Sequence, residues 1–209
     1  MSLWAIIPIK PLRKGKSRLA TILSEEERTR LNQELLIKTL DSLRKVQEID
    51  QTLVISYDTE ALTIARNCGA RTIQENHCTS MNRSLRRATI ATKAFNASKT
   101  LVLPADLPLI NEKDINKFIS KSESPPEVII AADRKLDGTN ALLINPIGII
   151  DYDFGPWSFK KHIEQVQRKN IRLEICNMES LGFDLDLPED LYYLMKKKKI
   201  KFEIKLEKP

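Results

Sequence analysis

The segment LWAIIPIKPLRKGKSR at residues 3–18 joins an apolar run to a strongly basic loop, and this junction indicates the class of fold. Residues 3–9 are apolar throughout, which predicts a strand that is buried on both faces. Five of the next nine residues are Lys or Arg. Loops at the ends of buried strands often carry binding residues, and clustered cations with free backbone N–H groups suit a polyphosphate. The alternative is an ordinary solvated loop.

The tripeptide Gly15-Lys16-Ser17 within this loop is similar to the end of a P-loop. A P-loop needs a second glycine five residues before Gly15, and that position is Lys10. The P-loop is therefore excluded, and the cations of this loop need another explanation.

Strand patterns and helix patterns alternate along the rest of the chain. Ser24 and Glu27 form a capping-box pattern ahead of leucines at helical spacing, which predicts a helix of about 20 residues. A second helix is expected between a cap at Asp58 and an end at Gly69. Further strands are expected at 52–56, 72–73, 100–103, 128–132, 141–144 and 172–176, and further helices at 81–95, 111–120, 159–169 and 191–198. This alternation indicates a three-layer α/β fold with a mostly parallel, mixed sheet, in which ligands bind beyond the carboxyl ends of the strands.

The composition excludes several classes of protein. With 209 residues, 42% hydrophobic and 30% charged, the chain is expected to form a single globular domain over residues 1–209. No apolar run reaches the ~20 residues of a membrane helix, and the N-terminus has no signal-peptide pattern. The 3 cysteines are widely spaced and suit neither a disulfide framework nor a metal site. We therefore expect a cytoplasmic protein with no membrane partner.

A basic C-terminal tail carries most of the net charge of +6. Residues 196–209 hold seven Lys and two Glu, so this segment alone contributes +5. No aromatic platform for stacked bases accompanies the lysines, so we expect a solvated helix end and no nucleic-acid partner. Residues 200–206 alternate between apolar and charged residues, which predicts an edge strand. Such a strand could pair with a second copy of the chain, which would make a homodimer.

Carboxylates occur at two points where predicted strands end. Asp106 follows the strand at 100–103, and Asp184 and Asp186 lie in the segment FDLDLP at 183–188. Mg²⁺ prefers oxygen ligands and is typically held by one or two carboxylates together with substrate phosphates. The two segments could therefore converge on one metal ion. The alternative is that each aspartate is a helix cap or a turn residue, Asp186 standing just before Leu187-Pro188.

Small residues at 138–140 and 154–159 suggest an anion site. Gly138-Thr139-Asn140 precedes a predicted strand, and Gly155 to Ser158 precedes a predicted helix. Glycines, small hydroxyls and a helix N-terminus together can bind an anion. The alternative is a turn followed by an ordinary Ser N-cap. His162 lies one turn into the helix, and a single histidine in such a position is more often structural than catalytic.

Taken together and in order, five segments resemble a known family: PIK…KSRLA at 8–20, LPADLPL at 103–109, GTNALL at 138–143, FGP…SF…H at 154–162 and DLD…PEDL at 184–191. They resemble the CofC family, the 2-phospho-L-lactate or phosphoenolpyruvate guanylyltransferases of coenzyme F-420 biosynthesis. The resemblance implies a Rossmann-like nucleotidyltransferase fold of the nucleotide-diphospho-sugar transferase type. It implies transfer of GMP from GTP to 2-phospho-L-lactate, phosphoenolpyruvate or 3-phospho-D-glycerate, with release of pyrophosphate.

The resemblance also implies roles for individual residues. The implied Mg²⁺ ligands are Asp106, Asp184 and Asp186. The implied catalytic residues are Lys16 and Asp106. The implied contacts to the nucleotide are Lys10, Lys16, Arg18 and Asn82. The implied contacts to the phosphate and carboxylate of the acceptor are Thr139, Gly155 and Ser158.

Two features depart from the family pattern. Trp157 stands where the family often has a small residue, and the Lys-rich tail has no counterpart. Two other functions remain as alternatives. One is a nucleotidyltransferase for a molybdopterin or a sugar phosphate, although those enzymes usually have more glycines than the single Gly15 after the first strand. The other is a non-catalytic nucleotide-binding or nucleic-acid-binding protein.

Overall fold

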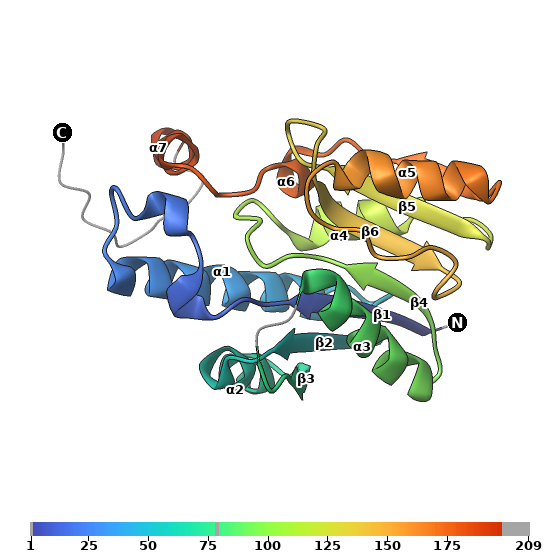
Figure 1. Ribbon diagram of the computed structural model, residues 1–209, viewed down its shortest axis with the longest axis horizontal. Coiled ribbons are helices and arrows are strands. Elements are labelled where there is room, and N and C mark those ends of the chain that lie inside the picture. The colour runs from blue at the N-terminus through green and yellow to red at the C-terminus, as the bar shows by residue number, and fades with distance from the viewer. Residues whose placement is uncertain (1, 78–79, 198–209) are drawn as a thin grey trace.

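The computed structural model describes residues 2–77 and 80–197, and Figure 1 shows the arrangement of the elements. The strands are β1 Ser2–Pro8, β2 Gln51–Ser56, β3 Arg71–Gln74, β4 Ala97–Val102, β5 Glu127–Ala132, β6 Thr139–Asn145 and β7 Arg172–Ile175. The α-helices are α1 Glu25–Arg44, α2 Thr59–Asn67, α3 Met81–Ala94, α4 Glu112–Ile119, α5 Ser158–Arg168, α6 Glu179–Gly182 and α7 Pro188–Lys196. Two short 3-10 helices, η1 Leu12–Lys14 and η2 Ser17–Leu19, follow β1.

The strands in the described part of the chain form one seven-stranded sheet in the order β3-β2-β1-β4-β6-β5-β7. Strand β6 is antiparallel to both of its neighbours, β4 and β5, while the other pairs are parallel. The predicted mixed, mostly parallel sheet is therefore confirmed. Because β6 runs against its neighbours, its first residue, Thr139, lies at the edge where β4 and β5 end.

Helices cover both faces of this sheet, because successive side chains of a buried strand point to opposite sides. In β1, Leu3, Ala5 and Ile7 pack in the cluster that contains α1, α2 and α4. Trp4 and Ile6 pack in the opposite cluster, which contains residues of α3 and α5. The predicted three layers are thus confirmed (Figure 1).

Three of the predicted helix boundaries have the expected chemistry. Ser24 Oγ accepts a hydrogen bond from the backbone N–H of Glu27 at 3.2 Å, and the Glu27 carboxylate accepts from the Ser24 N–H at 2.8 Å. Asp58 caps α2 through the N–H groups of Glu60 and Ala61. Gly69 follows α2 with φ +84°, a conformation that favours glycine.

Several boundaries differ from the predictions. Helix α5 begins at Ser158 rather than Phe159, and the residue in the cap position is Trp157, so the alternative in which Ser158 is an ordinary N-cap is wrong. Helix α7 begins at Pro188 rather than Leu191, because proline is favoured in a first turn. The four-residue helix α6 was not predicted, since it is too short to show periodicity. The predicted strand at 200–206 and most of the tail at 196–209 lie outside the described residues.

A third apolar cluster joins the chain segments that carry the candidate site. Leu19 from η2 and Leu31 from α1 pack with Leu185 and with Leu191 and Leu194 of α7. The basic loop after β1 and the FDLDLP segment are therefore held against each other by buried side chains. Among the described residues, no helix has the length and apolarity needed to cross a membrane.

Candidate active site

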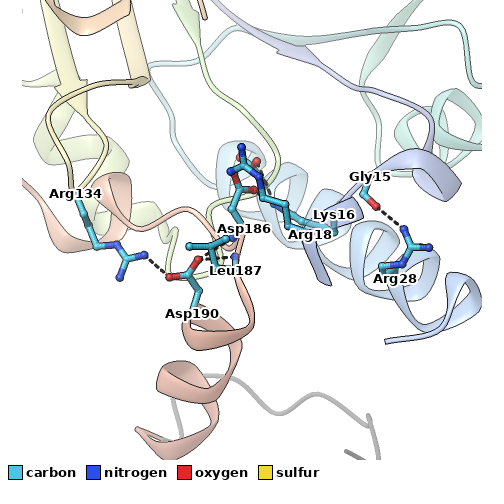
Figure 2. A network of polar contacts seen from close by, with 9 residues as sticks. Gly15, Lys16, Arg18, Arg28, Arg134, Asp186, Leu187 and Asp190 are labelled. Atoms are coloured by element: carbon cyan, nitrogen blue, oxygen red, sulfur yellow. Dashed lines mark hydrogen bonds and ion pairs between the residues drawn. The ribbon is translucent and has the colours of Figure 1, made fainter. Parts of the chain in front are cut away.

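Lys16 lies between two carboxylates from distant parts of the chain. Its Nζ is 3.1 Å from Asp106 Oδ2 and 3.2 Å from Asp186 Oδ1, and its side chain is only 5% exposed. The basic loop follows β1, Asp106 follows β4, and Asp186 precedes α7. The predicted convergence of Asp106 with the 184–186 segment is therefore observed, and a basic residue of the loop stands at its centre. Figure 2 shows Lys16 and Arg18 directed toward Asp186.

The basic loop has an unusual backbone conformation at Lys16. Lys16 has φ +54°, in the left-handed region that non-glycine residues rarely adopt outside functional or tightly constrained positions. Helix α1 holds the loop in place: Asn32 Nδ2 donates to the carbonyl of Leu12 at 2.6 Å, and Arg28 donates to the carbonyl of Gly15 at 3.3 Å (Figure 2). A Cβ on Gly15 would lie 2.4 Å from Asn32 Nδ2, so a larger residue would displace the Asn32 side chain from its contact with Leu12.

The charges of this cluster are strongly coupled. Burial alone would lower the pKa of Lys16, but the carboxylates of Asp106 and Asp186 outweigh it and hold this pKa above its ordinary value. Burial raises the pKa of Asp184, a backbone hydrogen bond opposes that shift, and the negative charges of Asp186 and Asp106 raise it further. The three carboxylates thus lie within electrostatic reach of one another.

The other predicted nucleotide contacts are Arg18, Lys10 and Asn82. Arg18 contacts Asp186, whereas Asn82 contacts a different loop. Arg18 is exposed, and its guanidinium is 3.6 Å from Asp186 Oδ2. Lys10 is exposed on the same loop. Asn82, at the start of α3, is engaged elsewhere: its amide donates to the carbonyl of Phe154 at 3.0 Å and accepts from the N–H of Phe154 at 2.8 Å. Asn82 therefore holds the loop that leads to Gly155.

Asp190 holds the segment that carries Asp186. Its Oδ2 accepts from the N–H of Asp186 at 3.0 Å and from the N–H of Leu187 at 2.8 Å. Asp190 also accepts from Arg134 of the β5–β6 turn (Figure 2), and the guanidinium of Arg134 lies 3.9 Å from the centre of the Phe183 ring. Asp190 rather than Asp186 therefore takes the capping role at α7, and the Asp186 side chain is left for the site.

The carboxylates have the chemistry of a Mg²⁺ site. Hard oxygen donors suit Mg²⁺, which commonly uses one or two protein carboxylates and completes its shell with water and phosphate. Among the described residues, no group of three acidic, His or Cys side chains is already arranged around one point. The ammonium of Lys16 supplies the positive charge between Asp106 and Asp186. Asp106, Asp184 and Asp186 are the side chains of this cluster that could hold a divalent ion.

The three predicted acceptor residues lie together. The N–H of Thr139 donates to Ser158 Oγ at 2.9 Å, and the N–H of Ser158 donates to the carbonyl of Gly155 at 3.1 Å. Gly155 has φ +128°, a conformation that a residue with a side chain rarely adopts. Strand β6 thus supplies one hydroxyl and the N-terminus of α5 supplies the other, as anion binding would need.

Turn residues that the sequence did not single out join two halves of the site. One half is the cluster of Lys16 with Asp106 and Asp186, and the other, the acceptor half, holds the predicted acceptor residues Thr139, Gly155 and Ser158. Asp137 Oδ1 accepts from the N–H of Trp157 at 3.0 Å, and the carbonyl of Asp137 accepts from the N–H of Phe159. Arg134, three residues earlier, reaches Asp190 beside the acidic cluster. The β5–β6 turn therefore contacts both the start of α5 and the start of α7. No local pattern indicates this, because the partners are remote in sequence.

His162 is also part of the acceptor half. It is fully buried, with Nδ1 at 3.0 Å from Thr139 Oγ1 and Nε2 at 3.1 Å from the N–H of Asp153. Burial lowers its pKa to about 4, although Asp153 opposes the shift. One feature of the sequence indicates that His162 lies near the predicted acceptor residues: Ser158 and His162 are four residues apart and so share one helix face.

Comparison with known proteins agrees with this geometry. The family model described as "Guanylyl transferase CofC like" matches residues 3–203. The chain belongs to the CofC-like guanylyltransferase family. The resemblance drawn from the five sequence segments is thereby confirmed, and the chain is a nucleotidyltransferase by family.

Relatives in the CofC-like family cover nearly the whole chain. It is 35% identical over 191 residues to the phosphoenolpyruvate guanylyltransferase of Rubrobacter xylanophilus, covering 91% of this chain and 92% of that one. It is 31% identical over 189 residues to the 2-phospho-L-lactate guanylyltransferase of Methanobrevibacter smithii, covering 90% and 82%.

Solved structures confirm the fold of this CofC-like chain. A protein from Desulfovibrio desulfuricans G20, assigned as a nucleotide-diphospho-sugar transferase, matches with a TM-score of 0.75 at 13% identity, over 95% of this chain and 89% of that one. The 4-diphosphocytidyl-2C-methyl-D-erythritol synthase of Anaerococcus prevotii matches with a TM-score of 0.63 at 13% identity, over 95% and 99%. The predicted nucleotide-diphospho-sugar transferase type of fold is therefore confirmed.

Proposed function

We propose that this protein transfers GMP from GTP to a phosphorylated three-carbon acid, with release of pyrophosphate, in the biosynthesis of coenzyme F-420. The observation that carries the proposal is the placement of Lys16 between Asp106 and Asp186 at the carboxyl edge of the sheet. A cation and two carboxylates there suit a triphosphate with a divalent ion. The names of the relatives support guanylyl transfer to phosphoenolpyruvate or 2-phospho-L-lactate.

The proposed reaction is an in-line displacement at the α-phosphorus of GTP. An oxygen of the acceptor phosphate forms the new P–O bond, and the bond from the α-phosphorus to the bridging oxygen of the pyrophosphate breaks. A phosphate is already nucleophilic at pH 7, so the step needs no protein nucleophile. The main obstacle is that two anions have to meet.

The residues of the two halves of the site divide this task. Lys16, Arg18 and Lys10 are proposed to lie along the triphosphate and stabilise the charge that develops on pyrophosphate. Asp106, Asp184 and Asp186 are proposed to hold Mg²⁺, which when bound neutralises the α-phosphate and orients both partners. Keeping Mg²⁺ and Lys16 together on the same carboxylates would be repulsive, so nucleotide binding is expected to draw Lys16 toward the phosphates.

The acceptor is proposed to bind at Thr139, Gly155 and Ser158. Two hydroxyls and the N-terminus of α5 lie there, and the dipole of the helix favours an anion. Asn82 is proposed to act beside the nucleotide by fixing Phe154 and with it the loop to Gly155. A cytoplasmic location fits an enzyme that uses GTP.

The test is pyrophosphate release from GTP and Mg²⁺ in the presence of each candidate acid in turn. The acids are 2-phospho-L-lactate, phosphoenolpyruvate and 3-phospho-D-glycerate, with ATP as the control donor and omission of the acid as the blank. Release that depends on one acid and on GTP is the expected result. Release that does not depend on any acid, or failure of GTP to bind in the presence of Mg²⁺, would contradict the proposal.

A further inference from the structure

The two ring nitrogens of His162 contact groups of different kinds. Nε2 is 3.1 Å from the backbone N–H of Asp153, and a backbone amide can only donate. Nε2 must therefore present its lone pair. Nδ1 is 3.0 Å from the hydroxyl oxygen of Thr139, which can either donate or accept. The direction of the hydrogen bond to Thr139 depends on whether Nδ1 carries a hydrogen.

The contact with Asp153 fixes that direction. A neutral imidazole has one N–H and one lone pair, so an acceptor at Nε2 leaves the hydrogen on Nδ1. Burial lowers the pKa of His162 to about 4, with the charge of Asp153 raising it and that of Lys161 lowering it, so the ring is neutral at pH 7. Nδ1 then donates to Thr139 Oγ1.

The two hydroxyls of the acceptor half are consequently left as donors. Thr139 Oγ1 accepts from His162, so the hydroxyl hydrogen of Thr139 points away from the ring. Ser158 Oγ accepts from the N–H of Thr139, so its hydrogen is free as well. In the described part of the chain, neither hydroxyl has a second hydrogen-bond partner.

We propose that His162 is a positioning residue that makes the Thr139 hydroxyl a hydrogen-bond donor toward a negatively charged oxygen of the acceptor. This inference rests on the proposed function, which places the acceptor at Thr139 and Ser158. With the hydrogen on Nε2 instead, Thr139 would donate to the ring and turn only lone pairs toward an anion. Hydrogen bonds to charged oxygens are stronger than neutral ones, so this direction affects acceptor affinity.

Two substitutions separate this role from a merely structural one. In His162→Asn the side-chain amide nitrogen takes the place of Nδ1, so it keeps the donor to Thr139 and loses the acceptor for Asp153. In His162→Gln the amide takes the place of Nε2, so it keeps the acceptor for Asp153 and loses the donor to Thr139. Each variant therefore keeps one of the two hydrogen bonds of the His162 ring and loses the other.

The expected readout is a selective change in the KM for the acceptor, measured with phosphoenolpyruvate and 2-phospho-L-lactate. His162→Gln should raise that KM about tenfold or more, the scale of one hydrogen bond to a charged group, and His162→Asn about threefold or less. The KM for GTP should change by no more than about twofold in either variant. The reverse order, or equal effects of both variants, would overturn the proposal, because the Asp153 contact or simple packing would then explain the effect.

A second measurement reads the tautomer directly in the unsubstituted protein. The chain has two histidines, so long-range proton–nitrogen correlations of ¹⁵N-labelled protein need only be assigned between His162 and His77. We expect a protonated Nδ1 and an unprotonated Nε2 for His162 at pH 7. A hydrogen on Nε2, or a charged ring, would overturn the inference. Because this measurement needs no substrate, absence of guanylyl transfer would overturn the proposed function without changing what the tautomer shows.

Discussion

Arg134, in the turn between β5 and β6, donates a hydrogen bond to Asp190 in the first turn of α7, 56 residues later in the chain. The same guanidinium stacks on Phe183, so it contacts the chain on both sides of Asp184 and Asp186. Asp190 in turn holds the backbone at Asp186 and Leu187. This arrangement holds the backbone at Asp186 through residues that stand outside the cluster of Lys16, Asp106 and Asp186.

Replacing Arg134 should therefore lower the metal affinity of Asp106, Asp184 and Asp186, although Arg134 is not one of the proposed metal ligands. We expect Arg134→Met, which keeps an apolar contact with Phe183, to weaken Mn²⁺ binding by nucleotide-free protein about tenfold, because Asp190 loses its charged partner and the segment at 184–187 becomes less ordered. Titration calorimetry or the electron spin resonance of Mn²⁺ measures this. Lys135→Met, on the exposed neighbouring residue, is the matched control. Equal affinities of the two variants would show that Arg134 does not order the carboxylates.

Lys16→Gln should have opposite effects on metal binding and on turnover. Removing the ammonium that sits 3.1 Å from Asp106 and 3.2 Å from Asp186 should tighten Mn²⁺ binding by the nucleotide-free protein by at least about threefold. The same change should lower kcat about 100-fold, because the charge that develops on pyrophosphate loses a stabilising cation. Lys14→Gln, on the exposed face of the same loop, serves as the control for metal affinity. Weaker Mn²⁺ binding in Lys16→Gln would contradict competition between Lys16 and the metal.

Asp106→Asn should lower kcat about 100-fold or more, the scale of losing one major stabiliser of the transition state. The loss should persist at saturating Mg²⁺ if Asp106 orients the metal and the α-phosphate together. Steady-state pyrophosphate release measures it. Asp41→Asn, which removes only a surface ion pair with Arg44, should leave the rate within about twofold. Near-normal turnover of Asp106→Asn at limiting Mg²⁺ would refute the role of Asp106 in metal binding.

Ser158→Ala should act on the acceptor rather than on the nucleotide. The variant removes one free hydroxyl donor and leaves the N–H of Thr139 without its 2.9 Å partner. We expect the KM for the acceptor to rise about tenfold. The KM for GTP, measured in the same experiment, is the internal control and should move by no more than about twofold. Equal increases in both constants would place Ser158 elsewhere in the site.

The burial of His162 should make the folded protein sensitive to acid. The pKa is about 4 in the folded protein against an ordinary value of 6.5, so the unfolded chain binds the proton first as the pH falls. The contribution of neutral His162 to the free energy of unfolding is therefore fully present above pH 6.5 and is lost as the pH falls toward 4. His162 should account for about 2 kcal/mol of loss between pH 7 and pH 4.5.

Denaturant unfolding at the two pH values measures this contribution. His162→Asn lacks the titrating ring and should lose correspondingly less stability over the interval. His77→Asn, on an exposed residue, should behave like the unsubstituted protein. The same loss in His162→Asn as in the unsubstituted protein would show that other groups cause the acid sensitivity.

The layered fold could be predicted from sequence because its signals are local. The apolar run at 3–9 and the capping box at Ser24 each determine their element within a few residues, and the structure has both. The short helix α6 could not be predicted, since four residues span barely one turn. The left-handed Trp157 at the start of α5 displaced the expected cap, because its position depends on the contact with Asp137.

The sequence predicts which residue types form the site, but it does not predict the contacts between residues that are far apart in the chain. The carboxylate chemistry that suits Mg²⁺ correctly pairs Asp106 with the 184–186 segment, but the expected strand-end position of that segment is wrong, because it lies between α6 and α7. The sequence predicts Lys16 along a phosphate, whereas the structure places it between the carboxylates. The roles of Arg134, Asp137 and Asp190 depend on partners that the fold brings together from far along the chain. Such partners leave no periodic or spacing pattern. His162 was visible, but its tautomer follows only from the Asp153 contact.

The most direct test of the account is identification of the product by ³¹P NMR after incubation with GTP, Mg²⁺ and the acid that supports pyrophosphate release. We expect two coupled diphosphate signals, from GMP joined through its phosphate to the phosphate of the acid, together with pyrophosphate in equal amount. GMP with pyrophosphate but no coupled pair would mean hydrolysis. GDP would mean attack at a different phosphorus. Either result would contradict transfer of GMP to a phosphorylated acid.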